Sequence, residues 1–243
     1  MKSVRNSLLA LSFLALAAPV AGQTPFQFVS GGTVTAFGYY VGTYTGAMGP
    51  TYSQTVELNC VDFFHHVSLG QKWTANITRL GDDLSATRAG PIFTNALDLY
   101  RQAAWLITQY AGQTATEIGD IQTTIWSLFD KNGTVTPNAP SPATALPDWR
   151  ALAQLNFQSY ADWQNWVVVT DVNSYQRDAS GNYLRDSYGN LIDNPNSVQE
   201  FLMYQPTVTP EPATVMLFGT GLAGLGWMHR RRKKQSEQPK DTA

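Results

Sequence analysis

The sequence predicts an α+β fold: one sheet-rich domain with about three helices, flanked by two terminal segments of different composition. Residues 31–80 are rich in threonine, aromatic and β-branched residues at a period of two, which favours strands. From residue 94 onward the apolar residues recur at three and four, which favours helices. The central residues 23–209 have a length suited to one domain with a sizeable core.

Residues 1–22 have the three parts of a signal peptide. Lys2 and Arg5 are basic, Leu8–Ala18 is an apolar run too short to span a membrane, and small residues follow. We expect cleavage after Gly22, since Pro19 would be awkwardly placed for a cut after Ala21. The sequence therefore predicts export.

Strands are predicted first in three stretches, in which glycines mark bulges or turns. These stretches are Gly31–Tyr44, Thr55–Phe64 and Lys72–Leu80. Two further strands are predicted at Val167–Thr170 and Val198–Tyr204, the second leading to the C-terminal segment.

Three helices are predicted between these strands. The first covers Thr94–Tyr110 and ends at Gly112. The second ends near Phe129, and Gly119 leaves its start open. The third begins at Pro147 and continues to about Trp163.

Residues 177–192 form a short repeat, in which R-D-A-S-G-N-Y-L is followed by R-D-S-Y-G-N-L-I. Each unit has Gly-Asn between residues that are able to pair, so hairpin turns are the simplest interpretation. A calcium loop is the alternative, because Asp178, Ser180 and Asn182 alternate. Against calcium, the glycine falls too early for an EF-hand loop and no glutamate closes it.

The charge of the central domain disfavours nucleic acid as a partner. Residues 23–209 hold eight basic and fifteen acidic side chains, a net charge of −7. Such a surface offers little to a phosphate backbone.

The C-terminal segment has three consecutive parts. Pro210, Glu211 and Pro212 interrupt the chain, Ala213–Met228 is uncharged and apolar, and a basic block follows, consisting of Arg230, Arg231, Arg232, Lys233 and Lys234. As a helix the apolar part reaches about 24 Å, against roughly 30 Å of hydrocarbon core. The basic block would stay on the cytoplasmic side.

In this order the segment resembles the PEP-CTERM sorting tail of Gram-negative bacteria. The resemblance implies an exosortase and the secretion machinery as partners, and transient attachment to the inner membrane through the tail. It also implies removal of the tail and a final location at the cell surface or outside the cell. An uncut membrane anchor is the alternative.

Cys60 is the one cysteine, so an exported chain cannot form an internal disulfide. It could be an inert buried thiol, an intermolecular disulfide, a nucleophile or part of another internal cross-link. A Cys/His hydrolase would need His65 or His66, but six strand residues separate Cys60 from His66 by about 20 Å. The remaining histidine, His229, is in the tail, so metal-ligand spacing is absent and no metal or other cofactor is expected.

Gln122 is predicted to face the core. At 100° per residue it falls within the apolar arc of Ile118, Ile121, Ile125 and Phe129, whereas Gln102 lies off the apolar face of its own helix. A buried carboxamide without partners costs about 1–3 kcal/mol, so Gln122 needs a core hydrogen bond or a chemical role.

Residues 121–126 and Cys60-Val61 resemble the apolar-Gln-x-x-apolar-Trp motif and the partner cysteine of bacterial thioester domains. The resemblance covers about 31–130 and implies an internal Cys60–Gln122 thioester that captures amines. It departs from the family at Asn59, where an aromatic or large apolar residue is usual. Polar or shielding help would come from His65, His66, Thr123, Thr124 and Trp126.

The sequence thus favours a non-enzymatic surface or extracellular-matrix protein. Its function would be adhesion through the thioester, with an amine-bearing surface ligand as partner. A secreted Cys60-dependent hydrolase and a structural matrix protein with an inert buried cysteine are the alternatives.

Overall fold

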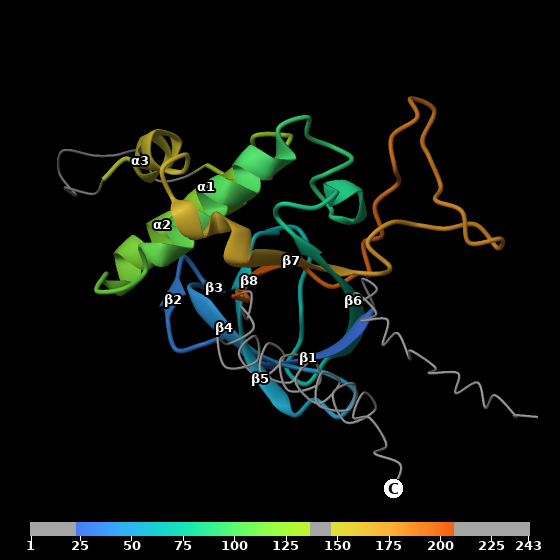
Figure 1. Cartoon of the computed structure of the whole chain (residues 1–243), viewed down its shortest axis with the longest axis horizontal. Coiled ribbons are helices and arrows are strands. Elements are labelled where there is room, and N and C mark those ends of the chain that lie inside the picture. The colour runs from blue at the N-terminus through green and yellow to red at the C-terminus, as the bar shows by residue number, and fades with distance from the viewer. Residues whose placement is uncertain (1–22, 137–146, 207–243) are drawn as a thin grey trace, which may run out of the picture. The chain divides into compact units, whose positions relative to one another are not determined.

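The computed structural model describes residues 23–136 and 147–206 (Figure 1). The predicted signal peptide of residues 1–22 lies outside them. So do the predicted sorting residues, the apolar span 213–228 and the basic block 230–234. Within the described residues, no helix is long and apolar enough to cross a membrane.

Six antiparallel strands close into a barrel in the order β1-β4-β5-β8-β7-β6. They are β1 Thr24–Ser30, β4 Thr43–Met48, β5 Gln54–Cys60, β6 Lys72–Arg79, β7 Trp166–Asp171 and β8 Phe201–Tyr204. The predicted α+β class is confirmed. β1 was not predicted, although Phe26 and Phe28 alternate toward the barrel interior with half-buried or exposed neighbours.

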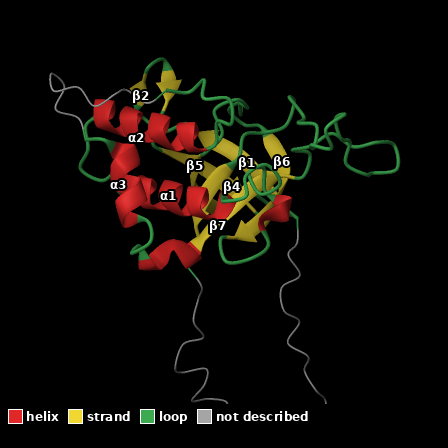
Figure 2. Cartoon of the chain, turned by 90° about the horizontal axis from the view of Figure 1, so that it is seen from above, coloured by secondary structure: helices red, strands yellow, loops and turns green. Residues whose placement is uncertain are grey.

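Three helices lie together on one side of the barrel (Figures 1 and 2). They are α1 Ala96–Thr108, α2 Ala115–Leu128 and α3 Trp149–Asn156. Their apolar faces share one core cluster with Val168 and Leu202 of the barrel. The predicted third helix was too long at its C-terminal end, because the chain leaves α3 after residue 156 and makes a separate short 3-10 helix, Ala161–Asn165.

The start of α2, which the sequence left open, lies before Gly119. Thr114 and Glu117 form a capping box, in which each side chain accepts a hydrogen bond from the other's backbone N–H. Gly119 therefore lies inside the helix. A glycine is needed there because a Cβ would lie 2.5 Å from Cβ of Ala36. The close approach brings the strand pair β2 Thr35–Ala36 and β3 Tyr39–Tyr40 onto this helix.

The pair β2–β3 is a two-stranded hairpin, separate from the barrel. Its two turn residues, Phe37 and Gly38, have φ of 55° and 82°, the positive values that a type I′ turn requires. The hairpin places Tyr39 against Trp126 of α2, with ring centroids 5.9 Å apart.

The repeat of residues 177–192 extends away from the barrel as two small loops (Figure 1). Bridges at Arg177–Tyr183 and Arg185–Leu191 agree with the predicted turns. Asp178 Oδ1 accepts from the backbone N–H groups of Ser180 and Asn182, and Oδ2 accepts from the Asn182 amide. Because these carboxylate oxygens already face donors, the geometry favours turns over calcium ligation.

Candidate functional site

Cys60 and Gln122, 62 positions apart in the sequence, meet in the core. Cys60 is the last residue of β5 and pairs with Phe201 of β8. Gln122 lies on the buried face of α2, between the fully buried Ile121 and Ile125. The Gln122 Nε2 atom donates a hydrogen bond of 2.8 Å to the Cys60 carbonyl oxygen. The core position predicted for Gln122 is confirmed, with an exposed fraction of 0%.

The Cys60 sulfur is enclosed by two polar contacts. The Trp126 Nε1–H donates to Sγ at 3.3 Å, and Sγ lies 3.1 Å from the carbonyl oxygen of Asp62, to which the thiol donates. Burial raises the pKa of the Cys60 thiol to about 12, the charge of Asp62 adds to this shift, and the indole donor opposes it. The thiol is therefore protonated at neutral pH, as is typical of a shielded cysteine.

The oxygen of the Gln122 carboxamide also has a partner. Tyr110, in the turn after α1, donates its hydroxyl to Gln122 Oε1 at 2.9 Å. No sequence motif indicated a role for Tyr110. The available signal was the short α1–α2 connection, which makes the helices antiparallel neighbours and brings the end of α1 close to the first turns of α2. Both ends of the Gln122 carboxamide are thus fixed by hydrogen bonds.

Asn59, the residue that departs from the thioester-domain pattern, fits the buried strand. Its exposed fraction is 3%. Its Oδ1 accepts from the Thr43 hydroxyl at 3.0 Å, and its Nδ2 donates to the Leu202 carbonyl at 3.4 Å. An asparagine is accommodated here because neighbouring strands on both sides satisfy its side chain.

Two of the predicted supporting residues do not reach the Cys60–Gln122 pair with their hydroxyl groups. Thr123 and Thr124 donate to the carbonyls of Gly119 and Asp120, one turn earlier in α2. These bonds are within the helix and use the protons that would have helped the carboxamide.

A cavity of about 510 Å³ reaches Cys60. Trp126 lines it beside the cysteine, while Tyr39 and Tyr40 of the hairpin line another part, together with the exposed His66. Both His65 and His66 line this cavity together with Cys60. Aromatic side chains thus form part of the wall of this cavity.

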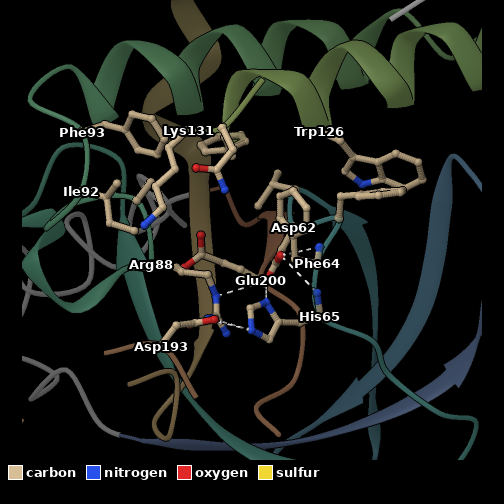
Figure 3. Close-up of a pocket in the computed structure, with 15 residues that line it drawn as sticks. Asp62, Phe64, His65, Arg88, Ile92, Phe93, Trp126, Lys131, Asp193 and Glu200 are labelled. Carbon is tan, nitrogen blue, oxygen red and sulfur yellow. Dashed lines mark hydrogen bonds and ion pairs between the residues drawn. The ribbon is translucent and has the colours of Figure 1, made fainter. Parts of the chain in front are cut away.

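His65 also belongs to a partly buried ion cluster of four side chains, Asp62, His65, Arg88 and the half-exposed Asp193 (Figure 3). Its Nδ1 lies 2.8 Å from Asp62 Oδ2, and its Nε2 lies 2.8 Å from Asp193 Oδ2. Both ring nitrogens face carboxylates, so neither is directed at Cys60. The geometry gives a Cys60 hydrolase no base at His65.

Arg88 completes the cluster. Its Nε lies 3.1 Å from Asp62 Oδ2, and Nη1 contacts Asp193 Oδ1. Nη2 donates to the Ser197 hydroxyl at 2.7 Å. The cluster thereby connects the loop after β5 to Asp193, the residue that follows the repeat of residues 177–192. Sequence reasoning missed it because residues 62, 88 and 193 are far apart and no motif relates them.

The cluster forms one wall of a second, smaller cavity of about 210 Å³. Figure 3 shows Phe64, Ile92 and Phe93 around it, with Lys131 extending over the space. Trp126 lines this cavity as well as the larger one. Among the residues that the structure describes, no group of three or more His, Cys, Asp and Glu side chains could hold a metal ion.

The His65 contacts predict a pH-dependent stability. Burial lowers the pKa of His65, but its hydrogen bonds to Asp193 and Asp62 outweigh burial and raise the pKa to about 9, above the ordinary 6.5. A raised folded-state pKa gives stability that is fully present below pH 6.5 and is lost as the pH rises through about 9. We expect urea unfolding to show this loss in the wild type and to show much less of it in His65→Gln. Equal losses of stability in the wild type and in His65→Gln would show that His65 does not cause the pH dependence.

Comparison with known proteins gave one match. The model of the PEP-CTERM protein-sorting motif matches residues 208–232. No curated protein and no solved structure matches the chain significantly. The predicted sorting motif is confirmed, and the chain is an exported protein of the kind that an exosortase sorts through a membrane-anchored intermediate.

Proposed function

We propose that this exosortase-sorted protein is an adhesive surface or matrix protein, not an enzyme, whose Cys60 and Gln122 form an internal thioester. The observation that carries the proposal is the buried contact between Gln122 Nε2 and the Cys60 carbonyl at 2.8 Å. It joins the two residues that a thioester requires, in a site where Trp126 covers the sulfur. Proximity of this kind can offset several kcal/mol of an activation barrier.

The proposed reaction with a ligand is an acyl transfer. An amine enters the larger cavity, which Cys60 lines, attacks the Gln122 carbonyl carbon of the thioester and forms an N-substituted amide. The bond from that carbon to Cys60 Sγ breaks, and the thiolate takes a proton from the attacking nitrogen. The domain is then covalently attached to its ligand and Cys60 is a free thiol. No second reactive group is needed, because the energy of the thioester drives the transfer.

The test is an intact-mass measurement of the exported protein. We expect a mass one ammonia below that of the processed sequence, and a gain of one methylamine after treatment with methylamine. The same spectrum reports the removal of residues 1–22 and of the tail. A folded protein with the full mass of its processed sequence, unchanged by methylamine, contradicts the thioester but leaves export and sorting intact.

A further inference from the structure

Three hydrogen bonds fix the Cys60–Gln122 site: two hold the Gln122 carboxamide and one holds the Cys60 sulfur. The carboxamide nitrogen donates to the Cys60 carbonyl at 2.8 Å, its oxygen accepts from the Tyr110 hydroxyl at 2.9 Å, and the Cys60 sulfur accepts from Trp126 at 3.3 Å. The contact with Tyr110 is on the atom that becomes negatively charged when the carbonyl carbon is attacked. A donor placed there before the reaction needs no reorganisation during it.

We propose that Tyr110 is a catalytic residue of the Cys60–Gln122 site, whose hydroxyl stabilises the oxyanion on Gln122 Oε1. The inference rests on the proposed thioester function and assigns it a residue that no sequence motif indicated. The same hydroxyl acts in both directions, because bond formation and amine capture pass through oxyanions on the same oxygen.

In bond formation, Cys60 Sγ attacks the Gln122 carbonyl carbon and the C=O electron pair moves to Oε1, which Tyr110 stabilises. The pair then returns and the C–N bond breaks. The amide nitrogen leaves as ammonia, with the thiol proton as its third hydrogen. In capture, an amine nitrogen attacks the same carbon, the C–S bond breaks, and the nitrogen proton goes to Cys60. Neither direction changes an oxidation state.

Other polar groups near the site have different partners. The Thr123 and Thr124 hydroxyls donate within α2, and His65 faces Asp62 and Asp193. The hydroxyl of Tyr44 donates to the Tyr40 carbonyl at 2.7 Å. Of the groups considered for this role, Tyr110 is the one whose proton is directed to Gln122 Oε1.

The surroundings of Tyr110 keep its hydroxyl protonated and therefore able to donate. Burial raises the pKa of Tyr110 well above its ordinary value, and the nearby Tyr44 and Cys60 add to this effect. In such a low-dielectric site, a hydrogen bond to a developing charge is stronger than the same bond in water.

The first test is Tyr110→Phe, which removes the hydroxyl and keeps the ring. We expect the rate of methylamine capture to fall about 100-fold, as when other oxyanion donors are removed, or the ammonia loss to disappear in a folded protein. Tyr175→Phe is the matched control, because it removes a hydroxyl that donates to the Arg88 carbonyl at 2.6 Å. The control should form the thioester and react at the wild-type rate.

A folded Tyr110→Phe protein that reacts as fast as the wild type overturns the role of Tyr110. In that case the wild type still shows ammonia loss and methylamine gain, so the proposed function stands. If the wild type itself lacks both mass changes, the proposed function fails and the role of Tyr110 fails with it.

A second variant decides the question if Tyr110→Phe does not fold. Incorporation of 3,5-difluorotyrosine at position 110 keeps the hydroxyl and makes it a stronger donor. We expect faster methylamine capture than in the wild type, with an unchanged melting temperature. A rate equal to or below that of the wild type contradicts oxyanion stabilisation by Tyr110.

Discussion

Alanine in place of either Cys60 or Gln122 is expected to abolish both the ammonia loss and the methylamine gain completely. Cys60→Ala removes the sulfur that forms the bond, and Gln122→Ala removes the carbonyl carbon that it joins. No residual reaction is expected, since each substitution deletes one of the two bonded atoms. Intact mass before and after methylamine treatment measures both effects in one experiment.

Gln102→Ala is the control for this pair of variants. Gln102 is also a buried glutamine, with an exposed fraction of 7%, but it lies on α1 and its Oε1 has no hydrogen-bond partner in the part of the chain that the structure describes. The control should show both mass changes. Ammonia loss that persists in Cys60→Ala or Gln122→Ala would mean that the mass change has another origin, and the thioester would have to be abandoned.

The second large effect is expected for Arg88→Met, which should lower the free energy of unfolding by about 3–5 kcal/mol, the usual result of removing one partner from a buried ion cluster. Arg88 is 11% exposed and faces Asp62, which is 7% exposed. Methionine has a similar length but cannot compensate the carboxylates of Asp62 and Asp193. The backbone of Arg88 keeps its own bonds to Glu200 and Tyr175.

For a domain of this size the change corresponds to a fall of about 6–20 °C in the melting temperature. Arg79→Met is the control, because the Arg79 side chain makes a hydrogen bond of 3.2 Å to the Gln205 carbonyl and has no ion pair within residues 23–136 and 147–206. Differential scanning calorimetry of both variants gives the comparison. Equal melting temperatures would show that water and His65 compensate Asp62 without the arginine.

The parts of the site that follow a regular period could be predicted from the sequence. Gln122 was placed in the core because 100° per residue puts it between apolar neighbours, and its exposed fraction is 0%. Cys60 was placed on a strand from the alternation of residues 55–64, and β5 ends at this residue. The pairing of Cys60 with Gln122 was predicted from a motif; the structure places Gln122 Nε2 2.8 Å from the Cys60 carbonyl oxygen, and the thioester itself stays a prediction.

Contacts that depend on tertiary packing could not be predicted in this way. Tyr110 lies in a turn, where no period indicates the direction of the side chain. Gln102 was placed off the apolar face of its helix, but it is buried with a 7% exposed fraction, since α1 is covered by α2 and α3 and also contacts the following 3-10 helix. The ion cluster joins residues 62, 88 and 193, and a single sequence contains no signal for a contact over such separations.

The closure of the barrel makes the environment of Cys60 depend on a late step of folding, the pairing of β5 with β8. Strand β5 is completed by β8, in which Leu202 lies 143 residues after its pairing partner Asn59. Contacts of such high sequence separation form slowly, because a long loop must close before any pairing is gained. A growing chain contains α2 long before it contains residues 201–204. The finished surroundings of the Cys60 thiol therefore depend on nearly the last described segment to be synthesised, and the proposed thioester would form only after β8 has paired with β5.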